Sequence, residues 1–342
     1  MKLKCATWPG CAVVAIFRAN PENNDAMLVR LPVAPVALSV ASRASTPMML
    51  FPSPVAATVA DAYVVAGVTG GLAIAAHLAG VLIVRLLPES KRPVILADTG
   101  YAVYKIVGLA FALLQTALGW MWYFPAAGSV AASRLLVPDG SVRFLAAVVL
   151  GSLVLWDLPC AFFIKKLRKA DMIIHHAAFA FIGYLMLAHL PNRYGLYYLG
   201  AQELSTLPVC LWNLYDAAYD EATTPPLAYK KQVTPALVEK LAAARDNWQL
   251  VAAAFFVVMR GFEFTRITLS RLLPDMLAVL PTAQAASMAL TLRLGLGFCL
   301  AFNGLQLFWL FQILSVMLGK IFGGDDAAAP SDADAVIADP NE

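Results

Sequence analysis

Long apolar segments recur along this chain and constrain its fold more than any other feature. Crossing a lipid bilayer requires about 20 mostly apolar residues in a helix. Seven stretches meet this requirement: residues 59–84, 101–124, 143–164, 172–190, 194–214, 248–270 and 287–318. Exposed strand edges are not tolerated in hydrocarbon, so such segments fold as helices. We therefore predict an all-α, polytopic membrane bundle with about seven transmembrane helices.

Composition gives independent support for a membrane protein. Apolar residues make up 60% of the 342 residues and charged residues 14%, against about 25% charged residues in soluble domains. The net charge of +3 is too small to suggest a nucleic-acid partner. The five cysteines show no CxxC spacing, so we expect neither a disulfide framework nor a bound metal.

The two ends of the chain differ from its apolar middle. The N-terminal stretch MKLKCATWPGCAVVAIF begins as a signal peptide does, so residues 1–55 form a lead-in that is either a targeting segment or unstructured. Residues 56–320 form the predicted transmembrane domain. Residues 321–342 hold six acidic and no basic residues, which is typical of a disordered, solvated tail.

Basic residues favour one orientation in the membrane. They are concentrated in alternate loops, at residues 85–92, 165–169 and 230–245. The positive-inside rule places such loops in the cytosol. We therefore expect the C-terminus to be cytosolic as well.

Two adjacent histidines, His175 and His176, lie inside the fourth apolar segment. The rise of an α-helix places them about 8–9 Å from the cytosolic boundary and Asp157 about 12 Å from it, while Glu203 lies near the middle of the fifth segment. Ionisable residues at such depth mark functional sites by default. One imidazole oriented by a carboxylate, with the other facing a substrate, would suit general acid–base catalysis. The alternative is that the pair only hydrogen-bonds neighbouring helices.

The sixth apolar segment carries Arg260, Glu263 and Arg266 at a spacing of three, which we expect to lie on one face. Two interpretations stay open: a buried Arg–Glu pair, or a cationic patch for the acidic group of a lipid or thioester cofactor. In the first segment, Gly67 and Gly71 form a GxxxG spacing, a weak indication of close helix packing.

Several chemistries are set aside on sequence grounds. Four histidines are too few for the histidine boxes of membrane di-iron desaturases and hydroxylases. The chain also lacks the GxxxxGK[ST], HExxH and GxSxG motifs.

Four motifs, in the order WDLPCAFF, KADMIIHHAAFAFIGYL, LGAQELSTLP and FNGLQLFWLFQIL, resemble the TLC domain. This is the family of the ceramide synthases, the TRAM proteins and other TLC-domain proteins, and the resemblance covers about residues 55–320. It implies a six-helix core in the endoplasmic reticulum membrane. In ceramide synthases two aspartates, three residues apart, follow the histidines. The matching positions here are Glu203 and Thr206, so the second acid is lost, and ELST is more similar to the smaller TLC-domain proteins of lipid homeostasis.

The resemblance implies two alternative functions. The first is ceramide-synthase-like transfer of a fatty-acyl group from acyl-CoA to a lipid amine. The second is non-catalytic lipid binding or regulation in the same cavity. Membrane lipids are the expected partners, no tightly bound cofactor is expected, acyl-CoA is a co-substrate only for the first function, and a homodimer is left open. The expected catalytic residues are His175, His176, Asp157 and Glu203, and the expected substrate-binding or lipid-binding residues are Arg260, Glu263, Arg266, Trp156 and Thr206.

Overall fold

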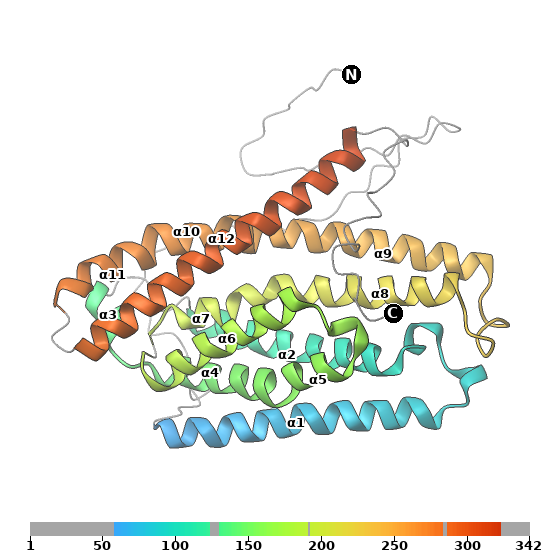
Figure 1. The fold of residues 1–342 in the computed structure, drawn as a ribbon, viewed down its shortest axis with the longest axis horizontal. Coiled ribbons are helices and arrows are strands. Elements are labelled where there is room, and N and C mark those ends of the chain that lie inside the picture. Colours follow the sequence, from blue (N-terminus) through green and yellow to red (C-terminus); the bar gives the residue numbers. More distant parts are fainter. Residues whose placement is uncertain (1–57, 124–129, 191, 283–285, 323–342) are drawn as a thin grey trace, which may run out of the picture. The chain divides into compact units, whose positions relative to one another are not determined.

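The computed structural model describes residues 58–123, 130–190, 192–282 and 286–322. The expected lead-in and nearly all of the expected acidic tail lie outside the described residues. Every regular element in the described ranges is a helix, which confirms the predicted all-α class (Figure 1).

The helices follow one another with few long connections. The α-helices of the described residues are, in order, α1 Val59–Leu86, α2 Thr99–Tyr123, α3 Ala131–Leu136, α4 Gly140–Ser152, α5 Leu158–Phe163, α6 Ala170–Ala188, α7 Gly195–Tyr198, α8 Thr206–Thr223, α9 Pro235–Phe256, α10 Phe264–Ile267, α11 Leu273–Val279 and α12 Ala286–Phe322. Three π-helical segments, in which hydrogen bonds run to the fifth residue along, join α4 to α5, α9 to α10 and α10 to α11. They are Leu153–Asp157, Val257–Glu263 and Thr268–Leu272.

Five described helical segments are long and apolar enough to cross a membrane. They are Val59–Leu86, Thr99–Met121, Gly140–Phe163, Met172–His189 and Ser287–Ser315. Residues 194–214 are broken into α7, a 3₁₀ turn and α8, and residues 248–270 are helical but carry three charged side chains. The membrane bundle is therefore confirmed, while seven spans stay a prediction.

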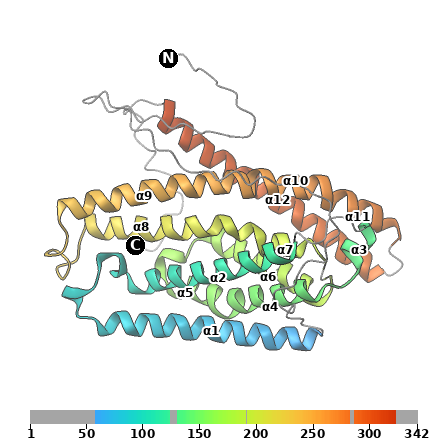
Figure 2. The same ribbon diagram turned by 180° about the vertical axis from the view of Figure 1, so that it is seen from behind.

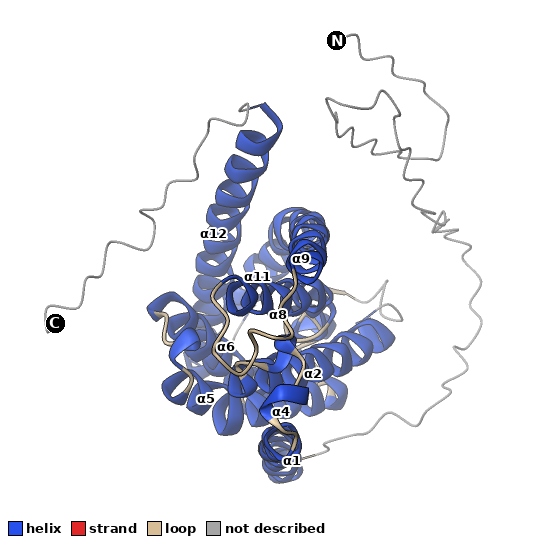
Figure 3. Cartoon of the chain, turned by 90° about the vertical axis from the view of Figure 1, so that its right-hand side faces the viewer, coloured by secondary structure: helices blue, strands red, loops and turns tan. Residues whose placement is uncertain are grey.

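Helix α1 packs against α4 at one edge of the bundle (Figure 3). Small residues allow this approach, because Ala62, Ala66 and Gly70 recur every four residues on the buried face of α1. A Cβ atom added to Gly151 of α4 would meet the backbone of Ala66. The close contact therefore depends on small residues from both helices.

The expected GxxxG pair does not form this contact, so that prediction is wrong. An added Cβ would meet no atom within 4 Å at Gly67 or at Gly71. The reason is rotational: α4 covers the face that carries Ala66 and Gly70, and both residues of the GxxxG spacing lie off that face.

The three basic loops meet at one end of the bundle, called here the basic end. The Gln232 side-chain amide donates to the Ser90 carbonyl oxygen at 2.5 Å. The Lys166 Nζ atom lies 3.5 Å from Asp98 Oδ2 and 3.4 Å from Glu221 Oε1. Loops that share one side of a membrane must gather in this way, so the structure agrees with the grouping that the positive-inside rule made.

The opposite end is held by a different polar cluster. Asp275 of α11 accepts hydrogen bonds from Arg134 of α3 at 2.6 Å and from the Tyr194 hydroxyl at 2.5 Å. These contacts tie three segments that are far apart in the sequence. In Figures 1 and 2, α12 crosses the other helices at an angle, and α8 and α9 run alongside each other.

Candidate functional site

A cavity of about 330 Å³ lies inside the bundle and is called here the central cavity. Pockets that bind small molecules usually measure about 300–1,000 Å³. Its walls come from α2, from the segment around Asp157, from α6, from residues 199–213, and from single side chains beyond them. Its polar and aromatic lining includes Tyr104, Lys105, Gln115, Trp156, Asp157, His175, His176, Glu203, Ser205, Thr206, Arg260 and Trp309.

Asp157 lies between a tyrosine and a histidine on the cavity wall. The Tyr104 hydroxyl donates to Asp157 Oδ1 at 2.5 Å, and His176 Nδ1 lies 3.0 Å from Oδ2. The N–H of the imidazole is not aligned with the carboxylate, as is common in ligand-free active sites, where such bonds tighten when substrate binds. The third and fourth apolar segments therefore bring Asp157 and His176 together, as their depths predict.

His175 points to a different neighbourhood from His176. Its ring lies 5.0, 5.4 and 5.3 Å from the rings of Phe179, Phe302 and Trp309, and its buried Nδ1 atom has no hydrogen-bond partner in the described ranges. Neighbouring residues on a helix diverge by about 100°. The pair therefore divides into one histidine at a carboxylate and one among aromatic rings of α6 and α12.

Arg260 is the centre of a second polar cluster. Its Nε donates to Ser205 Oγ at 2.8 Å, and its Nη2 donates to Thr206 Oγ1 at 2.9 Å and to Glu203 Oε1 at 3.3 Å. Thr206 also donates to Glu203 Oε2 at 2.6 Å. The buried Arg–Glu pair expected in this region therefore exists, but it joins Arg260 to Glu203, and Glu203 contacts no histidine directly.

Glu263 and Arg266 do not line the central cavity. They bond to each other, with Arg266 Nε 2.7 Å from Glu263 Oε2, and Arg266 is exposed. The expected common face with Arg260 is absent because the segment Val257–Glu263 is π-helical. A π-helical turn contains more residues than an α-helical turn, so residues three apart no longer lie on the same face of the helix.

Trp156 lies on the cavity wall, where it was expected to contact substrate or lipid. Its ring stacks on Tyr104 at 5.1 Å and contacts Phe111 and His77. The side chain is 4% exposed, and none of the described residues forms a hydrogen bond with its Nε1.

Sequence reasoning missed Lys105 and the aromatic residue Trp309. Lys105 lies within the second apolar segment, TGYAVYKIVGLAFALL, and a lysine at membrane depth is a sufficient signal to single it out. Its Nζ lies 5.1 and 5.3 Å from the ring centroids of Tyr101 and Tyr104. Trp309 had no such signal, because aromatic residues are common in apolar helices.

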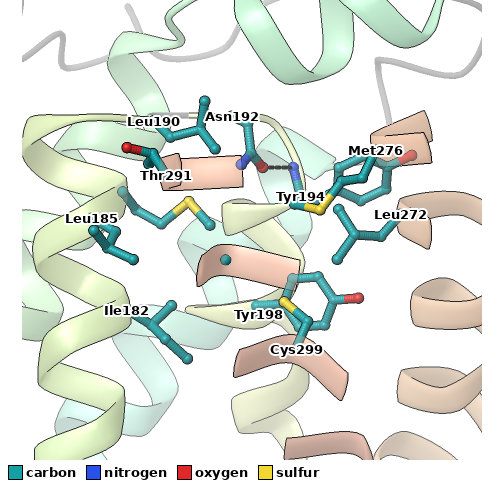
Figure 4. A pocket seen from close by; sticks show the side chains of 12 residues that line it. Ile182, Leu185, Leu190, Asn192, Tyr194, Tyr198, Leu272, Met276, Thr291 and Cys299 are labelled. Atoms are coloured by element: carbon teal, nitrogen blue, oxygen red, sulfur yellow. Dashed lines mark hydrogen bonds between the residues drawn. The ribbon is translucent and has the colours of Figure 1, made fainter. Parts of the chain in front are cut away.

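A second pocket, of about 20 Å³, lies near the opposite end between α6, Tyr194 and α12 (Figure 4). Its walls are almost entirely apolar, and Asn192 accepts a hydrogen bond there from the Tyr194 N–H at 3.1 Å. The volume suits about one water molecule, not a lipid chain. The central cavity is therefore the candidate functional site.

The described residues contain no group of three His, Cys, Asp or Glu side chains placed to hold a metal ion. The chemistry that this chain's own groups offer is proton transfer. A neutral imidazole whose Nδ1–H faces a carboxylate presents its Nε2 as an acceptor. In the Asp157–His176 pair, Nδ1 lies 3.0 Å from the carboxylate, so this arrangement forms once the N–H turns toward it. Beside this pair, the charges of Arg260 and Glu203 compensate each other.

Comparison with known proteins agrees with the resemblance found in the motifs. A family model described as the TLC domain matches residues 102–315, more than half of the chain. No curated protein and no solved structure matches the chain. The matched range contains every polar residue of the central cavity. The chain therefore belongs to the TLC-domain family, and its function is a membrane lipid-related one.

Proposed function

We propose that the protein transfers a fatty-acyl group from acyl-CoA to an amine or hydroxyl of a lipid. The observation that carries the proposal is the Asp157–His176 contact on the wall of the central cavity, with Tyr104 on the second carboxylate oxygen. A base held by an orienting carboxylate within reach of a substrate is what general acid–base catalysis needs.

In this proposal Nε2 of His176 takes the proton of the acceptor amine or hydroxyl as that group attacks the thioester carbonyl carbon. The new bond is an amide or ester, the carbon–sulfur bond breaks, and His176 returns the proton to the departing thiolate. Asp157 stabilises the imidazolium that exists between the two proton transfers. His175, with a free Nδ1 in the same wall, is placed to hold the substrate.

Arg260 and Glu203 act as positioning residues in this scheme. Arg260 already meets three oxygen atoms, so it supports the 203–206 turn and is not free for an incoming phosphate. Arg266 lies outside the cavity and pairs with Glu263. We therefore do not propose that Arg260 or Arg266 binds the acidic group of acyl-CoA.

A second candidate function, non-catalytic lipid binding, has one specific observation in its favour. At the position where ceramide synthases carry their second acid, Thr206 bonds to Glu203 and Arg260, so the cavity has no additional carboxylate there. A lipid held by the same walls would need no second acid.

Acyl transfer in membranes separates the two functions. Labelled long-chain acyl-CoA is offered with a sphingoid base or a lysophospholipid, and the lipid products are resolved. We expect product with the wild type and a loss of roughly 100-fold or more in His176→Ala. The matched control is His189→Ala, because His189 lies away from the cavity and contacts Tyr184. Absence of product from the wild type, with a lipid co-purifying, would overturn transfer and favour binding.

We also propose that the protein resides in the endoplasmic reticulum membrane with the basic end and the C-terminus in the cytosol. The gathering of three basic loops supports this orientation. An N-glycosylation acceptor inserted beside Pro138 should receive a glycan in microsomes, and one beside Lys231 should not. The reverse pattern would contradict the orientation.

A further inference from the structure

Lys105 brings a charge to the central cavity that the proposed mechanism does not use. A lysine ammonium has three donors and no acceptor. Its Nζ lies 5.1 and 5.3 Å from the ring centroids of Tyr101 and Tyr104, and within the described part of the chain it forms no ion pair or hydrogen bond. A charge at membrane depth is costly without a partner.

The carboxylates of the cavity are already engaged elsewhere. Asp157 meets Tyr104 with one oxygen and His176 with the other. Both Glu203 oxygens also accept hydrogen bonds, from Arg260 and Thr206. Three of these four carboxylate oxygens therefore accept a hydrogen bond, and the fourth, Asp157 Oδ2, lies 3.0 Å from His176 Nδ1.

A second donor on the same wall lacks a partner. Trp156 lines the cavity, is 4% exposed, and its buried Nε1 has no partner among the residues that the structure describes. An unmade hydrogen bond at a buried polar group costs about 1–3 kcal/mol. The two histidines of the wall can donate or accept, whereas Lys105 and Trp156 only donate, so a group that binds beside these two must accept hydrogen bonds.

We infer that the acceptor lipid of this cavity carries an anionic group, a phosphate or a carboxylate, which Lys105 binds near His176. That the bound lipid is the acceptor of an acyl group rests on the proposed function. That it carries a negative charge follows from the donors that lack partners. A cationic amine would add donors and a second positive charge beside Lys105. An anionic head supplies oxygens to Lys105 and neutralises its charge.

The test uses four single-chain probes with the same sixteen-carbon tail: hexadecyl phosphate, palmitate, hexadecanol and hexadecylamine. Affinities are measured for the full chain in bilayer discs of neutral lipid, with no acyl donor present. The wild type should bind the two anions at least tenfold more tightly than the alcohol or the amine. Lys105→Met should abolish that difference, and Lys105→Arg should keep it.

Lys165→Met is the matched control, because Lys165 is an exposed lysine at the basic end outside the cavity lining. It should leave the preference unchanged, which separates cavity binding from attraction to the protein surface. Should Lys105→Met fail to fold, Trp156→Phe provides a second test. That variant removes the free Nε1 donor and should weaken hexadecyl phosphate binding several-fold with little effect on hexadecanol.

Three outcomes would overturn the inference: no preference for anions in the wild type, a preference that survives Lys105→Met, or a tighter complex with hexadecylamine. Inorganic phosphate is the remaining arm. If it displaces hexadecyl phosphate at comparable concentration, the site takes a free anion and not a lipid head. Because binding is measured without turnover, His176→Ala should keep the preference, so failure of catalysis and failure of anion binding are distinguishable.

Discussion

At the scale of single residues, the charged groups on the wall of the central cavity differ in what they contact. Asp157 is matched with His176 and Tyr104, Arg260 is matched with Glu203, and Lys105 has no ion pair or hydrogen bond with the described residues. A matched pair stabilises a fixed geometry, whereas an unmatched charge at membrane depth indicates a ligand. In our proposals the first pair carries out catalysis, the second supports the cavity wall, and the lysine recognises the ligand.

Asp157→Asn should reduce the proposed transfer by roughly 100-fold or more while the protein stays folded. The amide has the same shape but cannot stabilise an imidazolium as a carboxylate does. Tyr104→Phe, which removes only the hydroxyl on the other oxygen, should cost less, about tenfold or below. Product formation is measured alongside the thermal unfolding midpoint. Full activity in Asp157→Asn would contradict the role given to this carboxylate.

Arg260→Met should destabilise the fold by roughly 3–5 kcal/mol, because it leaves the Glu203 carboxylate buried without its cation. Adding Glu203→Gln to that variant should recover part of the loss. Arg266→Met is the control, since its pair with Glu263 is exposed and should contribute only about 0–1 kcal/mol. Unfolding in detergent or bilayer discs measures all three. Equal losses for the two arginines would show that Arg260 has no special structural role.

At the scale of helices, the rotation of each helix about its axis determines which side chains line the central cavity. The π-helical segment Leu153–Asp157 ends with Asp157 on the cavity wall. The segment Val257–Glu263 places Arg260 inside and leaves the Glu263–Arg266 pair off the cavity wall. A π-helical turn takes up more residues than an α-helical turn, so each segment changes which residues after it face the cavity.

Gly151→Ala should lower the midpoint of thermal unfolding, because its methyl group would meet the backbone of Ala66, which cannot move aside as a side chain can. Overpacking of this kind costs typically about 1–3 kcal/mol. The matched control is Gly71→Ala, on the exposed face of α1, where an added Cβ meets no atom. Similar midpoints for the two variants would contradict the close approach of α1 and α4.

At the scale of the whole molecule, polar clusters outside the five apolar spans tie distant segments together. Lys166 and Gln232 join loops at the basic end, and Asp275 joins α3, Tyr194 and α11 at the other. Apolar helices in lipid gain little from further hydrophobic burial, so packing and polar contacts determine how the segments meet.

Stability should depend on pH through Asp275. Burial raises the pKa of this carboxyl group, but hydrogen bonds from Arg134 and Tyr194 more than offset that effect, so the pKa is lowered. A folded-state pKa below the unfolded value of about 3.9 contributes stability above that pH, and the contribution is lost as pH falls through the folded value.

Asp275→Asn should therefore lower the unfolding midpoint at pH 7, by an amount equivalent to about 1–3 kcal/mol. The difference from the wild type should shrink as the pH is taken below about 4. Asp246→Asn is the control, because Asp246 is an exposed residue of α9 that contacts its neighbour Arg245. A difference between Asp275→Asn and the wild type that stays constant from pH 7 to acid would contradict the role of the Asp275 charge.

The sequence by itself determined the class of fold and much of the content of the site. Apolar length and sparse charge specify a helical membrane bundle, because they depend only on local composition. Depth along a helix is also local, and it placed Asp157 and His176 at depths close enough for contact before any packing was known. The TLC motifs led to the family that the comparison confirmed.

Only the tertiary structure decided which charged groups meet. Glu203 pairs with Arg260 and not with a histidine, and Glu263 pairs with Arg266. The close contact between α1 and α4 is made at Gly151 and not at Gly71. These outcomes depend on the rotation of one helix against another and, for Arg260 and Glu263, also on a π-helical segment that alters the periodicity. Rotation is decided by long-range packing, which local composition does not encode.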